Sequence, residues 1–79
     1  MDSKILFFSS TTCGPCRLAK KQLTEEVKRE LNIHIFTDED WTDFTNYKIT
    51  SVPTFIKIVD GKEVSRKIGF KNIEELRNL

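Results

Sequence analysis

Residues 5–16 of this chain read ILFFSSTTCGPC: an apolar run, a short polar turn and two cysteines separated by two residues. The unbroken run Ile5–Phe8 predicts a strand over residues 4–9 that is buried on both faces. A helical pattern begins directly after it, and Pro15 suits the first turn of a helix, where a backbone N–H has no intrahelical partner. The segment therefore predicts a strand-to-helix turn with both cysteines at the start of the helix.

The segment after this turn has the spacing of one long amphipathic helix. A single apolar stripe runs through residues 13–31, and Asn32 ends the helix. The stripe comprises Cys16, Ala19, Leu23, Val27 and Leu31. Residues 33–37 then predict a second, short strand. Because two parallel strands need a crossover connection, we expect the helix to join them.

A second, short helix is predicted over residues 40–47. The acidic residues 38–40 stand at its start, where the helix dipole favours negative charge. Trp41 and Phe44 recur at helical spacing, so we expect both to face the core.

The last third of the chain predicts a hairpin and a final helix. Strands over residues 54–59 and 63–68 are joined by Asp60-Gly61, a strong two-residue hairpin signal. Asn72 and Glu75 have the spacing of a capping box for a last helix. Its docking residues are predicted to be Ile73, Leu76 and Leu79. The expected fold class is α/β, β-α-β-α-β-β-α, with a mixed four-stranded sheet flanked by helices.

Length and composition predict one soluble domain over residues 1–79. Hydrophobic residues make up 38% of the chain, and the formal net charge is +1 with acids and bases interspersed. This balance gives no electrostatic case for a nucleic-acid or membrane partner. The apolar run of residues 5–8 is too short for a signal-peptide core or a membrane span. We therefore expect a reducing, cytoplasmic setting, in which a lone close cysteine pair is more often catalytic or metal-binding than structural.

The two cysteines themselves favour thiol chemistry. Cys13 and Cys16 are the only cysteines, one helical turn apart. Such a pair can form a reversible disulfide, and a helix N-terminus beside it favours the thiolate form. The pattern therefore indicates thiol–disulfide exchange.

Two motifs together resemble the thioredoxin family. Cys13-Gly14-Pro15-Cys16 lies at a strand-to-helix turn, and Val52-Pro53-Thr54 precedes the hairpin some forty residues later. The resemblance covers essentially the whole chain in order, and it implies a thioredoxin-like fold. The length is instead that of a glutaredoxin, because the strand and helix that thioredoxins carry ahead of the active-site strand are absent. The chain is thus similar to a minimal thioredoxin.

The resemblance implies a role for each residue of the two motifs. Cys13 is the exposed nucleophile, and Cys16, one turn further and facing inward, is the resolving thiol. Val52 offers its backbone to an extended substrate segment, and Pro53 is expected to be cis. The residues that shape the active-site turn are Thr12, Gly14 and Pro15.

The chain departs from the family pattern at three positions. Thr12 stands where thioredoxins usually have tryptophan before the first cysteine. Phe7 replaces the buried aspartate that helps to deprotonate the second thiol. His34 falls where a lysine usually accompanies that aspartate. Two interpretations of His34 stay open, a proton-transfer group and an ordinary, partly exposed strand histidine.

The predicted function is that of a protein-disulfide reductase of the thioredoxin type. It needs no bound cofactor, because the Cys13–Cys16 pair carries the two electrons. The resemblance implies NADPH as the electron source, through a flavin-containing thioredoxin reductase, and protein disulfides as substrates. We expect the chain to act as a monomer.

Two other functions compete with this one. A glutaredoxin-like, glutathione-dependent thiol transferase fits the length, although glutaredoxins usually carry Pro-Tyr between the cysteines. A non-catalytic binding module would use the pair structurally or for a metal. One C-x-x-C motif provides two ligands, whereas a structural zinc site requires four, so no metal site is predicted within one chain.

Overall fold

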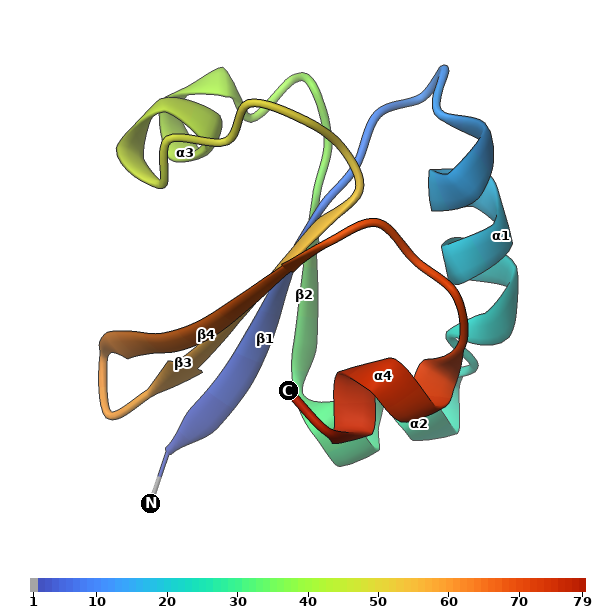
Figure 1. The fold of residues 1–79 in the computed structure, drawn as a ribbon, viewed down its shortest axis with the longest axis vertical. Coiled ribbons are helices and arrows are strands. Elements are labelled where there is room, and N and C mark those ends of the chain that lie inside the picture. The colour runs from blue at the N-terminus through green and yellow to red at the C-terminus, as the bar shows by residue number, and fades with distance from the viewer. Residues whose placement is uncertain (1) are drawn as a thin grey trace.

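The computed structural model describes residues 2–79, which form a mixed four-stranded sheet with helices on both faces (Figure 1). The strand order is β2-β1-β3-β4. β1 (Ser3–Phe8) pairs in parallel with β2 (Ile33–Phe36) and antiparallel with β3 (Thr54–Val59). β4 (Lys62–Ile68) closes the sheet as the antiparallel partner of β3. This architecture confirms the predicted fold class.

The helices divide between the two faces of the sheet. α1 (Gly14–Gln22), α2 (Glu25–Leu31) and α4 (Ile73–Arg77) cover one face, and α3 (Trp41–Asn46) lies over the other (Figure 1). No helix within the described residues is long and apolar enough to span a membrane.

Each face of the sheet has its own apolar cluster, because successive residues of β1 point to opposite sides. The cluster under α1, α2 and α4 contains Ile5, Phe7, Cys16, Ala19, Leu23, Phe55 and Leu76. The cluster under α3 contains Leu6, Phe8, Ile56 and Ile58. The first cluster includes a cysteine of the C-x-x-C motif, so the core of this face bears directly on the site.

The prediction of one helix over residues 13–31 is wrong, because the helix breaks after Gln22. Leu23 ends α1 with a non-helical ψ of 81°, and Thr24 adopts an extended conformation before α2. The Thr24 hydroxyl oxygen accepts a hydrogen bond of 3.2 Å from the backbone N–H of Val27, as an N-cap does. The apolar stripe continues across the break, which is why periodicity alone did not reveal it.

The prediction that Trp41 faces the core is also wrong, since Trp41 is 70% exposed. The Phe8 ring is contacted by Phe44, edge to face at 5.1 Å, and by Tyr47 at 5.6 Å. Phe44 lies in the second half of this six-residue helix, and Tyr47 is its C-cap residue. Trp41, its first residue, precedes the turn that lies over Phe8.

The last helix is capped and docked largely as predicted. The Asn72 side-chain oxygen accepts from the N–H of Glu75 at 3.1 Å. The Glu75 carboxylate reaches back to the N–H of Lys71 at 3.2 Å, one residue earlier than a capping box requires. Leu76 is buried, and Ile73 packs partly buried against the same cluster.

Candidate active site

Cys13 and Cys16 form a disulfide at the start of α1, with their Cα atoms 5.2 Å apart. Cys13 is the N-cap residue of the helix. Its Sγ accepts a hydrogen bond of 3.2 Å from the backbone N–H of Cys16, one of the N–H groups that the helix leaves without an intrahelical partner. The first sulfur is therefore held where the helix favours negative charge.

The two cysteines differ in exposure. Cys13 is partly exposed at the surface, whereas Cys16 is 0% exposed and belongs to the core cluster under α1. The resemblance implied this difference. A substrate sulfur can therefore reach Cys13 directly, but it cannot reach Cys16 in this conformation.

The turn before the helix is held by its own polar groups. The hydroxyls of Ser10 and Thr12 are hydrogen-bonded at 3.1 Å, and the Cys13 N–H donates to the Ser10 carbonyl at 3.3 Å. Thr12, Gly14 and Pro15 are exposed. Open space surrounds the position of a Cβ at Gly14, so no close approach within this chain requires glycine there.

The loop before β3 packs against the same core cluster as the two cysteines. Val52 and Cys13 both pack, partly buried, against the cluster that contains Cys16. The Val52–Pro53 peptide bond is cis, and the Pro53 carbonyl accepts a bond of 2.8 Å from the N–H of Gly69 at the end of β4. The sheet thus fixes this loop from both β3 and β4.

A small pocket of about 210 Å³ adjoins the same loop. It lies between α3 and the loop, and it is lined by Ser10, Phe44 and residues 49–52. Sequence analysis did not single out Phe44 or Ile49 as site residues, because their apolar spacing indicates only core positions.

Aromatic rings line the buried side of the site. The rings of Phe7 and Phe55 stack at 4.5 Å, and the ring of Phe70 lies 5.9 Å from that of Phe55. All three residues belong to, or pack against, the cluster of Cys16. Sequence analysis missed Phe70. The available signal in the sequence was a large apolar residue directly after Gly69, where the chain leaves the β-hairpin.

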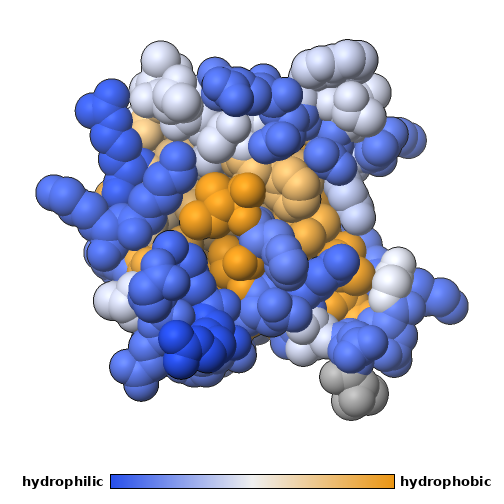
Figure 2. All heavy atoms as spheres, turned by 180° about the vertical axis from the view of Figure 1, so that it is seen from behind, coloured by the Kyte–Doolittle hydropathy of each residue, from blue (hydrophilic) through white to orange (hydrophobic). Residues whose placement is uncertain are grey.

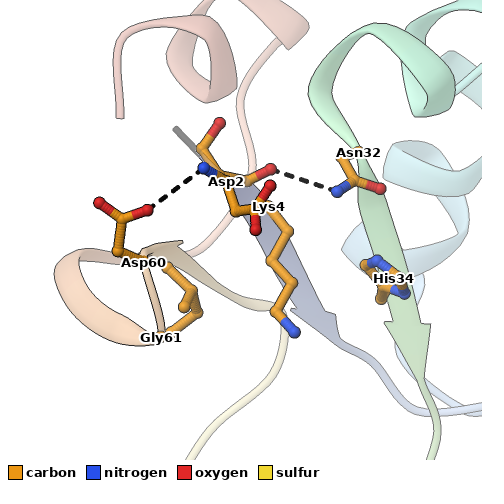
Figure 3. Close-up of a pocket in the computed structure, with 8 residues that line it drawn as sticks. Asp2, Lys4, Asn32, His34, Asp60 and Gly61 are labelled. Atoms are coloured by element: carbon orange, nitrogen blue, oxygen red, sulfur yellow. Dashed lines mark hydrogen bonds between the residues drawn. The ribbon is translucent and has the colours of Figure 1, made fainter.

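The structure does not bring His34 to the cysteines. His34 is exposed on β2 and pairs with Leu6 of β1, so it lies on the α3 face of the sheet, opposite the face that holds Cys16. It lines a separate pocket of about 430 Å³ with Lys4, Asn32 and Asp60 (Figure 3). The interpretation as an exposed strand histidine fits this position, and a direct proton transfer to Cys16 does not.

Among residues 2–79, no three His, Cys, Asp or Glu side chains gather as ligands for a metal ion.

The family model "Thioredoxin" matches residues 2–79. The chain belongs to the thioredoxin family. It is 36% identical over 75 residues to a thioredoxin of Chlamydia pneumoniae. The alignment covers 91% of this chain and 74% of that protein. It is 34% identical to thioredoxin H-type 1 of Nicotiana tabacum, covering 92% of this chain and 60% of that relative. The chain thus spans between about six tenths and three quarters of the length of these two relatives.

Solved structures agree with this assignment. Fasciola hepatica thioredoxin superposes with a TM-score of 0.78 at 32% identity, over 96% of this chain and 75% of that one. Oxidised mitochondrial thioredoxin 3 from Saccharomyces cerevisiae superposes with a TM-score of 0.77 at 26% identity. The match covers 98% of this chain and 74% of that one. With its Cys13–Cys16 pair, this thioredoxin-family chain is a dithiol–disulfide oxidoreductase with protein-disulfide reductase activity.

Proposed function

We propose that the chain, as a single domain over residues 1–79, reduces protein disulfides by a two-step exchange in which Cys13 attacks and Cys16 resolves. The observation that carries this order is the difference in exposure: Cys13 is accessible and Cys16 is 0% exposed. The Cys13 thiolate attacks one sulfur of the substrate disulfide, and the other substrate sulfur leaves as a thiolate. Cys16 then attacks Cys13, which forms the Cys13–Cys16 disulfide and releases the second substrate thiolate. The substrate gains two electrons and the pair loses two.

The neighbouring motif residues serve this exchange by position. Thr12, Gly14 and Pro15 shape the exposed turn that presents Cys13. Val52 offers backbone groups to an extended substrate segment next to the disulfide, and Pro53 holds that loop through its carbonyl bond to Gly69. The apolar contact of Val52 with the Cys16 cluster supports this placement.

We further propose that the oxidised pair is reduced by NADPH through a flavin-containing thioredoxin reductase, with no cofactor bound to the chain itself. The relatives at 30% identity or more that carry the name thioredoxin support this donor. The working form is a monomer in a reducing, cytoplasmic compartment, where a disulfide of this kind is catalytic rather than structural.

Trapping tests the order of attack. A Cys16→Ser variant, mixed with a protein disulfide, should accumulate a mixed disulfide through Cys13 that gel electrophoresis without reductant detects. A Cys13→Ser variant should form no such adduct. A Cys16→Ser protein that traps nothing, while the wild type reduces the same substrate, would contradict the assignment.

The reduction potential distinguishes the proposed function from its competitors. Equilibration in dithiothreitol buffers, followed by thiol counting, should give a reduction potential of about −270 mV, as for thioredoxin. A potential of about −200 mV would instead favour glutathione-coupled exchange. If no reversible disulfide forms, the chain is a binding module.

A further inference from the structure

The outer side of α1 carries a row of positive charges that begins one turn after Cys13 (Figure 1). Arg17 follows Cys13 by four residues, and its N–H donates to the Cys13 carbonyl at 3.2 Å. Lys20 and Lys21 follow Cys13 by seven and eight residues. Positions with these separations share one side of a helix. Arg17, Lys20 and Lys21 thus form a basic ridge that extends along α1 from the nucleophile.

The charges of the basic ridge are not neutralised within the part of the chain that the structure describes. α1 contains no Asp or Glu, and none of the ion pairs among residues 2–79 includes a member of the ridge. The ion-paired cations belong instead to α2, β4 and α4. Arg17 and Lys21 are exposed, and Lys20 is partly exposed. Since the whole chain has a formal net charge of only +1, this positive charge is a local feature of α1.

Helix stability explains only part of the basic ridge. Lys20 and Lys21 lie in the last turn of α1, where the helix dipole favours cations. Arg17 is the fourth residue of the helix, close to the end at which the same dipole favours anions. The charge of Arg17 therefore needs another explanation, and Arg17 is the member of the ridge nearest to Cys13 along the helix.

An exposed apolar residue adjoins the basic ridge. Leu18 is 46% exposed, and Lys21 lies three residues further along the same helix, so the two side chains are neighbours. An inorganic anion offers no apolar partner to such a side chain, whereas a protein surface combines apolar and charged groups. The basic ridge with Leu18 therefore fits a protein partner that carries acidic residues.

We propose that the basic ridge binds acidic residues of the protein substrate, so that the chain selects disulfides flanked by Asp or Glu. This proposal rests on the proposed function, in which Cys13 attacks protein disulfides. Along the helix axis, Arg17 lies about 6 Å and Lys21 about 12 Å from Cys13. An extended substrate segment advances about 3.3 Å per residue. The favoured acids therefore stand about two to four residues from the reactive cysteine of the substrate.

Matched peptide substrates test this selection. Three synthetic peptides with one cysteine each are oxidised to disulfide-linked dimers. They carry Glu, Gln or Lys at the second, third and fourth positions on both sides of the cysteine. An excess of reduced protein is mixed with each dimer, and chromatography after acid quenching gives the second-order rate constant of reduction. The quantity compared between proteins is the ratio of the rate constants for the Glu and Gln peptides.

The ridge variant combines Arg17→Gln, Lys20→Gln and Lys21→Gln. Glutamine has a similar helix propensity, so the variant should fold. At about 10 mM ionic strength, its Glu-to-Gln ratio should be at least about tenfold lower than that of wild type. In about 0.5 M NaCl the two proteins should agree within about twofold, because salt screens exposed charges. Equal ratios at low salt would overturn the proposal, even if the variant reduces every peptide more slowly, because the cations would then act on Cys13 and not on the substrate.

A matched control variant removes three exposed cations outside α1 that form no ion pair among the described residues. Its substitutions are Lys4→Gln, Arg29→Gln and Lys62→Gln. The net charge changes as it does in the ridge variant, so the Glu-to-Gln ratio should stay within about twofold of wild type if the position of the charges decides. A control that lowers the ratio as much as the ridge variant would show that net charge selects the substrate, and the proposal would be wrong.

The Gln peptide separates this proposal from the proposed function. Wild-type protein should reduce this peptide at both salt concentrations and should end with Cys13 and Cys16 joined in a disulfide. If wild-type protein reduces none of the peptides, the proposed function fails and this proposal fails with it. If it reduces the Gln peptide but has the same Glu-to-Gln ratio as the ridge variant, this proposal alone fails.

Discussion

The backbone N–H of Cys16 donates to the Sγ of Cys13 across 3.2 Å, so the buried member of the pair anchors the sulfur of the accessible one. The first turn of α1 thereby places one thiol at the surface and the other in the core. The two sulfurs share a turn of helix but differ in access to solvent.

This arrangement predicts selective alkylation of the reduced protein. With limiting iodoacetamide, Cys13 should be modified at least about tenfold faster than Cys16, because reaction requires an accessible thiolate. Peptide mass spectrometry after quenching measures the ratio. In urea, where both thiols are exposed, the preference should disappear. Equal labelling of the folded protein would mean that Cys16 is accessible in the reduced state.

The sequence predicted the sheet well because its signals are local. The apolar run of β1, the Asp60-Gly61 turn and the strand at Thr54–Val59 each depend on neighbouring residues only. Gly61 has a φ of 81° and Asp60 a φ of 52°, the left-handed values that such a two-residue turn requires.

The features that escaped prediction have two kinds of cause. The break at Thr24 is local: the apolar stripe allows one helix or two, and the N-cap bond from Val27 N–H to Thr24 selects two. The other two features depend on contacts between distant residues. The exposure of Trp41 depends on which turn of α3 lies over Phe8. Phe70 packs against the cluster of Cys16, and its ring contacts that of Phe55, fifteen positions earlier in the chain. Such features appear once the elements are packed together.

The side of the molecule opposite to the view of Figure 1 exposes apolar atoms near its centre, surrounded by polar side chains (Figure 2). Ile35 of the edge strand β2 is 37% exposed. It is paired with Phe7 of β1, so it lies on the face of the sheet that α1, α2 and α4 cover.

A domain of this size cannot cover all of its apolar surface, and the free energy of unfolding therefore depends strongly on the residues that are fully buried.

Leu76 tests this dependence. It is 1% exposed and is the buried residue through which α4 joins the cluster of Cys16. Leu76→Ala should lower the free energy of unfolding by about 2 to 5 kcal/mol, from lost burial and the cavity left behind. The control is Leu18→Ala on the outer side of α1, where the residue is 46% exposed. Urea titration followed by circular dichroism measures both, and similar losses would show that α4 does not complete the core.

Thr24 tests the break between α1 and α2. Thr24→Ala removes the hydroxyl that accepts from Val27 N–H and should cost about 1 kcal/mol of stability. Thr42→Ala, at an exposed position within α3, provides the comparison and should change stability by less than about 0.5 kcal/mol. A Thr24→Ala protein as stable as wild type would indicate that the N-cap bond does not set the start of α2.

Glu30 of α2 forms an ion pair with Arg77 of α4, and the strength of this link between the two helices depends on pH. The Arg77 guanidinium hydrogen-bonds the Glu30 carboxylate with two contacts, of 3.0 and 3.2 Å. This hydrogen bond, with a smaller contribution from the charge of Arg77, lowers the pKa of Glu30 below its ordinary value. Because the native pKa is lower than the unfolded one, the stabilisation is fully present above the unfolded value and is lost as the pH falls through the native one.

A Glu30→Gln variant should therefore melt below wild type at neutral pH, and the two melting temperatures should converge as the pH falls below about 4. The difference at neutral pH should also shrink in high salt, because both groups are at the surface. Glu39→Gln, in the exposed loop before α3, is the control for removing a carboxylate. It should change the melting temperature little, both at neutral pH and below about pH 4. Thermal melts followed by circular dichroism over this pH range measure the difference. A gap between Glu30→Gln and wild type that stays constant down to the lowest pH would mean that the effect comes from the shape of the side chain and not from the charge that Arg77 stabilises.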